Sequence, residues 1–184
     1  MVTGEALSPG ADALGEAKAY LRMVGGDEDA LLERLLRAAC EQCEAFTAKV
    51  LLARGFSETL AASAAWRRLR RLPVRAITSV EAVRADGLAS ALPVAAYAID
   101  IDGRGDGWVR LVEPGAARRL RVVYRAGMAE DWSALPEPLR HGIVRLAAHL
   151  YAERTGAEVK APPAAVTALW RPWRRLSFGR SVHA

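Results

Sequence analysis

The sequence predicts an α+β protein that is mainly α, with a helical bundle core, a small inserted antiparallel β-sheet and an extended C-terminal tail. Two observations predict this class. Apolar residues recur at helical spacing near both ends of the chain, and β-branched residues with glycine-rich turns fill the middle. Helices that precede and follow a sheet in the sequence can pack together. We therefore expect one domain over residues 1–165, with a separate C-terminal helix and tail over residues 166–184.

The first two helices are predicted by apolar stripes. Leu14, Leu21 and Val24 lie on the first stripe, which predicts a helix over residues 13–24 that ends at two glycines. Asp27 suits the N-cap of the next helix, and acidic residues follow it where the helix dipole favours them. A long amphipathic helix is expected over residues 28–49, with an apolar stripe of Leu31, Leu32, Leu35, Leu36, Ala39, Cys40, Cys43 and Phe46.

The middle of the chain predicts a β insertion over residues 58–127. The stretch 59–69 fits a strand or a helix. ITSVEAVR (77–84) and LRVVYR (120–125) are rich in β-branched residues and predict strands. Residues 97–101 and 108–112 flank DGRGDG, which predicts a hairpin.

Helix returns after the β insertion. PEPLRHGIVRLAAHLYAERTG has prolines in its first turn and a glycine at its end, which predicts a helix over residues 136–155. A short helix is expected from Pro162-Pro163 towards VTALWRPWRRLSFG (166–179). Two tryptophans, a phenylalanine and several arginines close to the C-terminus are unusual, because a chain end is commonly its least ordered part.

The overall composition fits a globular protein. The chain has 184 residues, of which 52% are hydrophobic, and a formal net charge of +5. No apolar run approaches the ~20 residues of a membrane span. The N-terminus lacks the basic and apolar blocks of a signal peptide, so we expect synthesis in the cytoplasm.

Charge is divided unevenly along the chain. Acidic residues outnumber basic ones over residues 1–46, and no acidic residue follows Glu158. Head-to-tail contacts between copies would then be favourable. Two solvated surfaces with no partner explain the pattern equally well.

The possible catalytic and metal-binding patterns are incomplete. Cys40 and Cys43 have CxxC spacing, but they lie within a helix, and no further zinc ligands accompany them, so we expect core packing. His149 and Glu153 alone are too few for a metal site. The aspartates of DGRGDG do not match a calcium loop, which leaves a hairpin turn. We expect no catalytic residue, no metal and no cofactor, and hence no enzyme.

Two stretches combine arginine with aromatic residues: WRRLRR (66–71) and the tail. Such residues can stack on bases and neutralise phosphates, or they can anchor a protein partner. A strand with one solvated basic face is a third explanation for 66–71, and folding back on the chain's own core is one for the tail.

Four stretches in this order resemble the head–tail connector, or adaptor, proteins of long-tailed bacteriophages and gene transfer agents. They span nearly the whole chain. The stretches are LGEAKAYLRM with DEDALLERLLRAACEQCEAFT (14–23, 27–47), LPVRAITSVEAVR (72–84), RLRVVYRAGM with ALPEPLRHGIVRLAAHLYAER (119–128, 134–154) and PPAAVTALWRPWRRL (162–176).

The resemblance implies a structural role in the virion neck. Such proteins form a ring of twelve copies below the portal, continue the DNA channel without sequence-specific binding, and offer a platform for the stopper and tail. The C-terminal segment would grip the portal, so we expect deletion of residues 170–184 to leave a folded domain that no longer joins it. The alternative is a nucleic-acid-binding module that uses 66–71 and 170–180. The expected portal-binding residues are Leu169, Trp170, Arg171, Trp173, Arg174, Arg175, Leu176 and Phe178.

Overall fold

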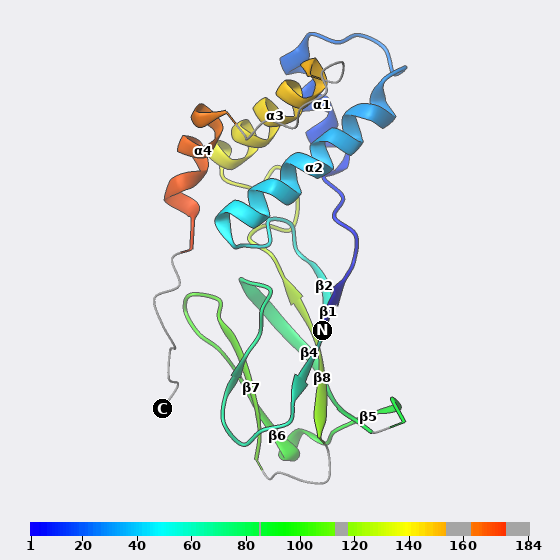
Figure 1. Cartoon of the computed structure of the whole chain (residues 1–184), viewed down its shortest axis with the longest axis vertical. Helices are drawn as coiled ribbons and strands as arrows, with labels where there is room; N and C mark the ends of the chain where they lie inside the picture. The colour runs from blue at the N-terminus through cyan, green and yellow to red at the C-terminus, as the bar shows by residue number, and fades with distance from the viewer. Residues whose placement is uncertain (85, 113–117, 154–162, 176–184) are drawn as a thin grey trace. The chain divides into compact units, whose positions relative to one another are not determined.

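The computed structural model describes residues 1–84, 86–112, 118–153 and 163–175 (Figure 1). The chain forms two compact units, and each contains segments that are distant in the sequence. The β unit comprises residues 1–6 and 53–127, and the helical unit comprises residues 7–52 and 128–175.

The helical unit contains four α-helices among the described residues (Figure 1). Helix α1 (Gly10–Leu21) starts after Pro9 and ends at Arg22, whose left-handed backbone (φ 54°) closes the last turn. The other elements are α2 (Asp29–Thr47), α3 (Glu137–Ala152), α4 (Ala164–Trp170) and the 3₁₀ turn η2 (Arg171–Trp173).

Apolar faces of these helices make one continuous core. The buried side chains of α2 recur at helical spacing and meet the buried face of α3. Val24, which the periodicity placed on the first apolar stripe, is instead fully exposed, because α1 ends before it. The largest buried side chains of the core are Leu32, Leu36, Leu51, Leu139, Ile143, Leu146 and Trp170.

The β unit consists of two antiparallel sheets. The five-stranded sheet has the order β1-β2-β8-β4-β5, and the three-stranded sheet has the order β3-β7-β6. The strands are β1 (Val2–Gly4), β2 (Arg54–Ala61), β3 (Arg67–Arg68), β4 (Val74–Val83), β5 (Ala89–Ala91), β6 (Tyr97–Ile101), β7 (Gly107–Leu111) and β8 (Arg119–Ala126), and a short 3₁₀ turn, η1 (Val94–Ala96), precedes β6.

The period of two along β8 shows how the larger sheet forms its core. Leu120, Val122 and Tyr124 are buried, Arg121 and Val123 between them are half-buried, and Arg119 and Arg125 are exposed. One face of the sheet therefore packs inward and the other carries arginine. Strand β8 is central because β2 and β4 pair with it on either side along its whole length.

The α+β class is confirmed, but the prediction of a chain dominated by a helical bundle is not. Two sheets make up a compact unit of their own, and this unit begins with β1 at the N-terminus, which the sequence pattern missed. The hairpin around DGRGDG and the three long helices lie close to their expected ranges.

Candidate functional site

The C-terminal segment is held against the helical unit by Trp170. Its side chain is 0% exposed, and it packs over Gly142 of α3. A Cβ atom on Gly142 would overlap the indole nitrogen and would lie 2.9 Å from Cδ1 and 3.0 Å from Cε2 of the indole. Gly142 is therefore the position at which α3 makes room for the tryptophan.

The end of α2 holds the residues that follow. The rings of Phe46 and Trp170 lie 5.9 Å apart, and the guanidinium group of Arg174 lies 5.7 Å from the centre of the Phe46 ring. The backbone N–H of Arg175 donates a 2.9 Å hydrogen bond to the carbonyl oxygen of Thr47. The chain is thus fixed in place up to Arg175.

The surface that remains at this segment is aromatic and basic. Trp173 is half-buried against the core, and Arg171 and Arg174 are exposed. Burial lowers the pKa of the nearby Lys49, and the positive charge of Arg175 lowers it further. Leu169 is half-buried, whereas Leu176 and Phe178 lie outside the described residues.

The position of Trp170 differs from the sequence-based expectation. The indole is enclosed by its own unit, so the side chain is not presented to a second molecule. Removing residues 170–184 would also remove part of this core, so the expectation that the truncated domain stays intact needs correction. The assignment of the other residues of the segment to portal binding stays a prediction.

The second basic stretch, 66–71, is partly engaged within the β unit, and Arg67, Arg70 and Arg71 are exposed. Arg68 pairs with the buried Asp106 at 2.7 Å, and Arg70 lies 3.5 Å from the buried Glu58. The guanidinium group of Arg110 lies 5.0 Å from the centre of the Trp66 ring. The stretch WRRLRR thus supplies partners for buried carboxylates. Sequence alone did not reveal this role, because Glu58 comes from β2 and Asp106 from the turn between β6 and β7.

Glu58 is the centre of a small buried polar network. Its carboxylate accepts hydrogen bonds from the Tyr124 hydroxyl (3.0 Å) and from the Arg70 backbone N–H (2.9 Å). Burial raises the pKa of Tyr124, and the neighbouring negative charge of Glu58 raises it further. Both hydrogen bonds reach Oε2, whereas Oε1 is buried without a hydrogen bond and has Arg70 Nε 3.5 Å away.

The CxxC cysteines are packed in the helical core. Cys40 and Cys43 form no disulfide and have no exposed surface, which confirms the expectation of core packing. Burial raises the pKa of Cys43, and the charges of Cys40 and Glu44 raise it further. A neutral, buried thiol is a poor nucleophile.

The raised pKa values predict a loss of stability at alkaline pH. The folded protein keeps Cys43 and Tyr124 neutral where the unfolded chain, with ordinary pKa values of 9.0 and 10.0, loses these protons. The contribution of these two groups to the free energy of unfolding is therefore complete below about pH 9 and is lost as the pH rises further. We expect the free energy of unfolding to fall above about pH 9, by up to about 1.4 kcal/mol per pH unit and group.

Urea unfolding of the wild type and of Cys43→Ala, followed at a series of pH values, measures this effect. The variant should lose the thiol component of the decline and keep the component that comes from Tyr124. An equal slope in both proteins would contradict the assignment to Cys43.

His149 and Glu153 lie side by side near the end of α3. His149 Nε2 lies 3.1 Å from Glu153 Oε2 one helical turn away. Within the described parts of the chain, no group of three or more His, Cys, Asp or Glu side chains converges as metal ligands. No helix in those same parts has the length and apolar character needed to cross a lipid bilayer.

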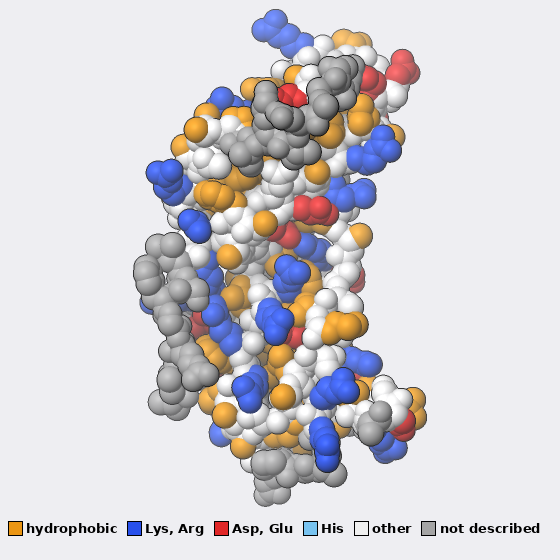
Figure 2. Space-filling view, viewed as in Figure 1, with side chains coloured by type: hydrophobic (Ala, Val, Ile, Leu, Met, Phe, Trp, Pro, Cys, Tyr) orange, Lys and Arg blue, Asp and Glu red, His pale blue; other side chains and the backbone are white. Residues whose placement is uncertain are grey.

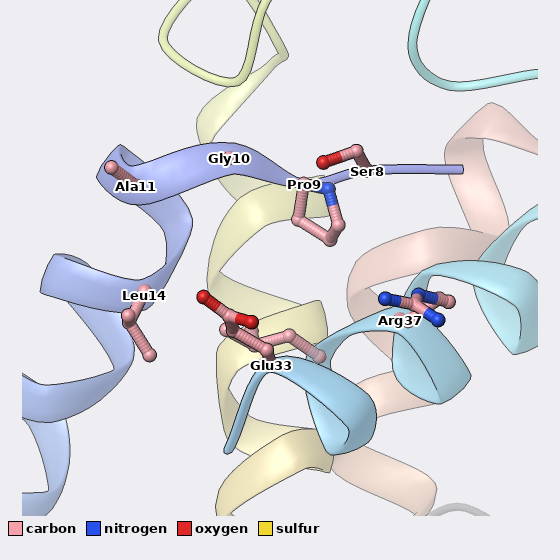
Figure 3. Close-up of a pocket in the computed structure, with 8 residues that line it drawn as sticks. Ser8, Pro9, Gly10, Ala11, Leu14, Glu33 and Arg37 are labelled. Atoms are coloured by element: carbon pink, nitrogen blue, oxygen red, sulfur yellow. The ribbon is translucent and has the colours of Figure 1, made fainter. Parts of the chain in front are cut away.

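A pocket of about 170 Å³ lies between the start of α1 and α2 in the helical unit (Figure 3). Glu33 and Arg37 project from α2, and Pro9 and Leu14 come from the α1 side. This lining offers the Ser8 hydroxyl, one carboxylate and one guanidinium group, and no hydrogen bond of Ser8 to a base is found among the described residues. The pocket provides no recognisable catalytic arrangement.

Comparison with known proteins shows which proteins share this fold. No protein-family model matches the chain, and no curated protein matches it. Three solved structures share its fold over nearly the entire length. One is the neck of an empty gene transfer agent (GTA) particle computed with C6 symmetry, at 29% identity, a TM-score of 0.78 and 100% coverage of both chains.

The other two come from native particles. A chain from the neck computed with C12 symmetry has 29% identity, a TM-score of 0.77 and 100% coverage of both chains. A chain from the virion has 28% identity, a TM-score of 0.74 and 97% coverage of both chains. The expected likeness to proteins of the gene-transfer-agent neck is therefore confirmed at the level of the whole fold.

Proposed function

We propose that this chain is a structural neck protein that forms a ring under the portal of a phage or gene transfer agent particle and joins head to tail. The observation that carries the proposal is full-length similarity, at 29% identity, to chains of particle necks computed with C6 and C12 symmetry. The ring would be a dodecamer that extends the DNA channel. Its partners would be the portal above and a stopper or tail-side neck protein below.

The C-terminal segment supplies the portal contact in this proposal. Trp173 and Arg174 offer the aromatic and guanidinium groups that dominate protein interfaces. Trp170 acts differently, since it fixes α4 to α3 and thereby holds the segment in place. A weak contact per copy becomes durable when a ring presents many copies at once. The proposed contact set is Leu169, Arg171, Trp173, Arg174 and Arg175, continued by Leu176 and Phe178.

The double substitution Trp173→Ala with Arg174→Ala tests this contact. We expect it to weaken binding to the portal ring by about 30-fold or more, as for the loss of an interface hot spot. Co-sedimentation with purified portal measures the affinity, and thermal unfolding confirms that the variant is folded.

The matched control is Tyr20→Ala with Arg34→Ala, which removes an exposed aromatic ring and an exposed arginine elsewhere on the helical unit. The control should bind as the wild type does. Unchanged binding by the Trp173/Arg174 variant would overturn the assignment of the contact. The neck role would then still be tested by microscopy of the chain with portal rings.

The alternative function, nucleic-acid binding through 66–71 and 170–180, fits the structure less well. Arg68 and Arg70 are engaged by buried carboxylates, and Trp170 is enclosed in the core. Arg68 and Trp170 could reach a nucleic acid only if the fold gave up their contacts, whereas Arg67, Arg70 and Arg71 remain exposed.

A further inference from the structure

The outward face of the larger sheet carries a row of arginines. Arg119, Arg121 and Arg125 occupy alternate positions of β8, so they project from one side of the central strand while Leu120 and Val122 point into the core. Alternate residues of a strand repeat at about 6.7 Å. The side chains therefore form a line of positive charge along the strand.

The neighbouring strands complete this face with small and hydroxyl-bearing residues. On β2, Thr59 lies opposite Arg121 and Ser57 lies opposite Val123. On the other side, β4 places Ser79 opposite Val123. We call the surface formed by Arg119, Arg121, Arg125, Ser57 and Thr59 the arginine face.

Among the described residues, two carboxylates lie on or beside the arginine face, fewer than its arginines. Glu5 accepts a 2.8 Å hydrogen bond from the backbone N–H of Gly55, which lies opposite Arg125, so its charge is at the Arg125 end of the face. Glu81 lies 3.5 Å from Arg121, with both side chains partly exposed, and an ion pair in such a setting is weak and exchangeable. Across the described β unit, arginines outnumber acidic residues, and the acids Glu58 and Asp106 are buried. Figure 2 shows the same imbalance, with many basic and few acidic side chains over the β strands.

We propose that the arginine face binds the phosphodiester backbone of duplex DNA without regard to sequence. Guanidinium groups pair with phosphate oxygens through two N–H donors, and Ser and Thr hydroxyls are common additional donors to phosphate. The side chains of the arginine face stand on β-strands, and no helix or loop among its defining residues could enter a groove and read base edges. Binding of this kind depends on charge and falls steeply with salt.

The composition of the face favours a nucleic acid over a protein partner. Protein interfaces have a core depleted of charge and enriched in aromatic anchors, whereas DNA-binding surfaces are polar and strongly positive. The arginine face lacks an aromatic anchor among its defining residues. The proposal does not require the ring, but a ring around DNA would present the same face in every copy and multiply a weak contact.

Fluorescence anisotropy with the full chain and a mixed-sequence duplex of about 30 base pairs tests this proposal. The association constant is measured between about 50 and 200 mM salt for the wild type and for Arg119→Gln with Arg121→Gln. We expect the double variant to bind about tenfold or more weakly at the lowest salt. The slope of log affinity against log salt should become shallower by about two, one for each lost phosphate contact.

Two further variants make the result specific. Arg104→Gln with Arg110→Gln removes the same charge from exposed positions elsewhere on the β unit and should leave the slope nearly unchanged. Arg119→Lys with Arg121→Lys keeps the charge and should retain most of the affinity and the slope. Circular dichroism shows whether each variant is folded.

An unchanged slope in the Arg119/Arg121 glutamine variant, or no salt-dependent binding by the wild type, would overturn the proposal. Loss of self-association in that variant without any change in DNA binding would also overturn it and would identify the face as an interface between copies. Portal co-sedimentation of the same variant separates the two proposals, because the neck role predicts that it still binds the portal.

Discussion

Replacing Trp170 by alanine should lower the free energy of unfolding of the helical unit by about 3–5 kcal/mol, the range for removing a large aromatic side chain from a core. The indole is 0% exposed and contacts both the Phe46 ring and the backbone of α3 at Gly142. Truncation to alanine leaves a cavity at the junction of three helices, which cannot collapse without moving α4. Urea unfolding followed by far-ultraviolet circular dichroism measures the change.

Trp173→Ala is the matched control for this substitution. Its side chain is only half-buried, so its removal should cost clearly less than the removal of Trp170. Both variants should bind the portal more weakly, but for different reasons. Trp170→Ala should lose binding because the helical unit is less stable, whereas Trp173→Ala should lose a contact while the protein stays folded. Equal stability of the two variants would show that Trp170 is not a core residue.

Gly142→Ala is expected to destabilise the helical unit by about 3 kcal/mol, as for overpacking of a tight core. Alanine is ordinarily the better helix former by about 1 kcal/mol, so the sign of this effect is diagnostic. It follows from geometry: the added methyl group would occupy the space of the Trp170 indole ring.

The double variant Gly142→Ala with Trp170→Ala isolates the contact. Without the indole the methyl group has space, so Gly142→Ala should stabilise the Trp170→Ala protein by about 0.5–1 kcal/mol. Unfolding midpoints of the four proteins in the cycle give the coupling. Equal effects of Gly142→Ala in both backgrounds would contradict the packing of Trp170 over Gly142.

Local patterns in the sequence were sufficient to predict the helices and strands whose apolar residues recur with a regular period. The stripe of α2 and the alternation of β8 follow directly from which residues must leave water, and the turn between β6 and β7 follows from its glycines. Strand β1 has no such signal. It forms because Val2, Thr3 and Gly4 pair with distant β2, and three residues are too few to show a period.

Most of the candidate site depends on contacts between residues that are distant in the sequence, and no local pattern predicts such contacts. The sequence alone suggested that Trp170 was available for a partner. Only the structure shows that it packs over Gly142 of α3. In the same way, Arg68 and Arg70 look like a nucleic-acid motif until Asp106 and Glu58 are seen beside them. The fold-level resemblance was more robust, because it depended on the order of many elements rather than on one contact.

Electron microscopy of the full chain mixed with the portal ring encoded in its own gene neighbourhood tests the neck role most directly. We expect the portal rings to carry an added ring of twelve copies on one face, coaxial with the channel, and the Trp173→Ala with Arg174→Ala variant to leave the portal bare. Portal rings that remain bare with the wild-type chain in excess would contradict the neck role.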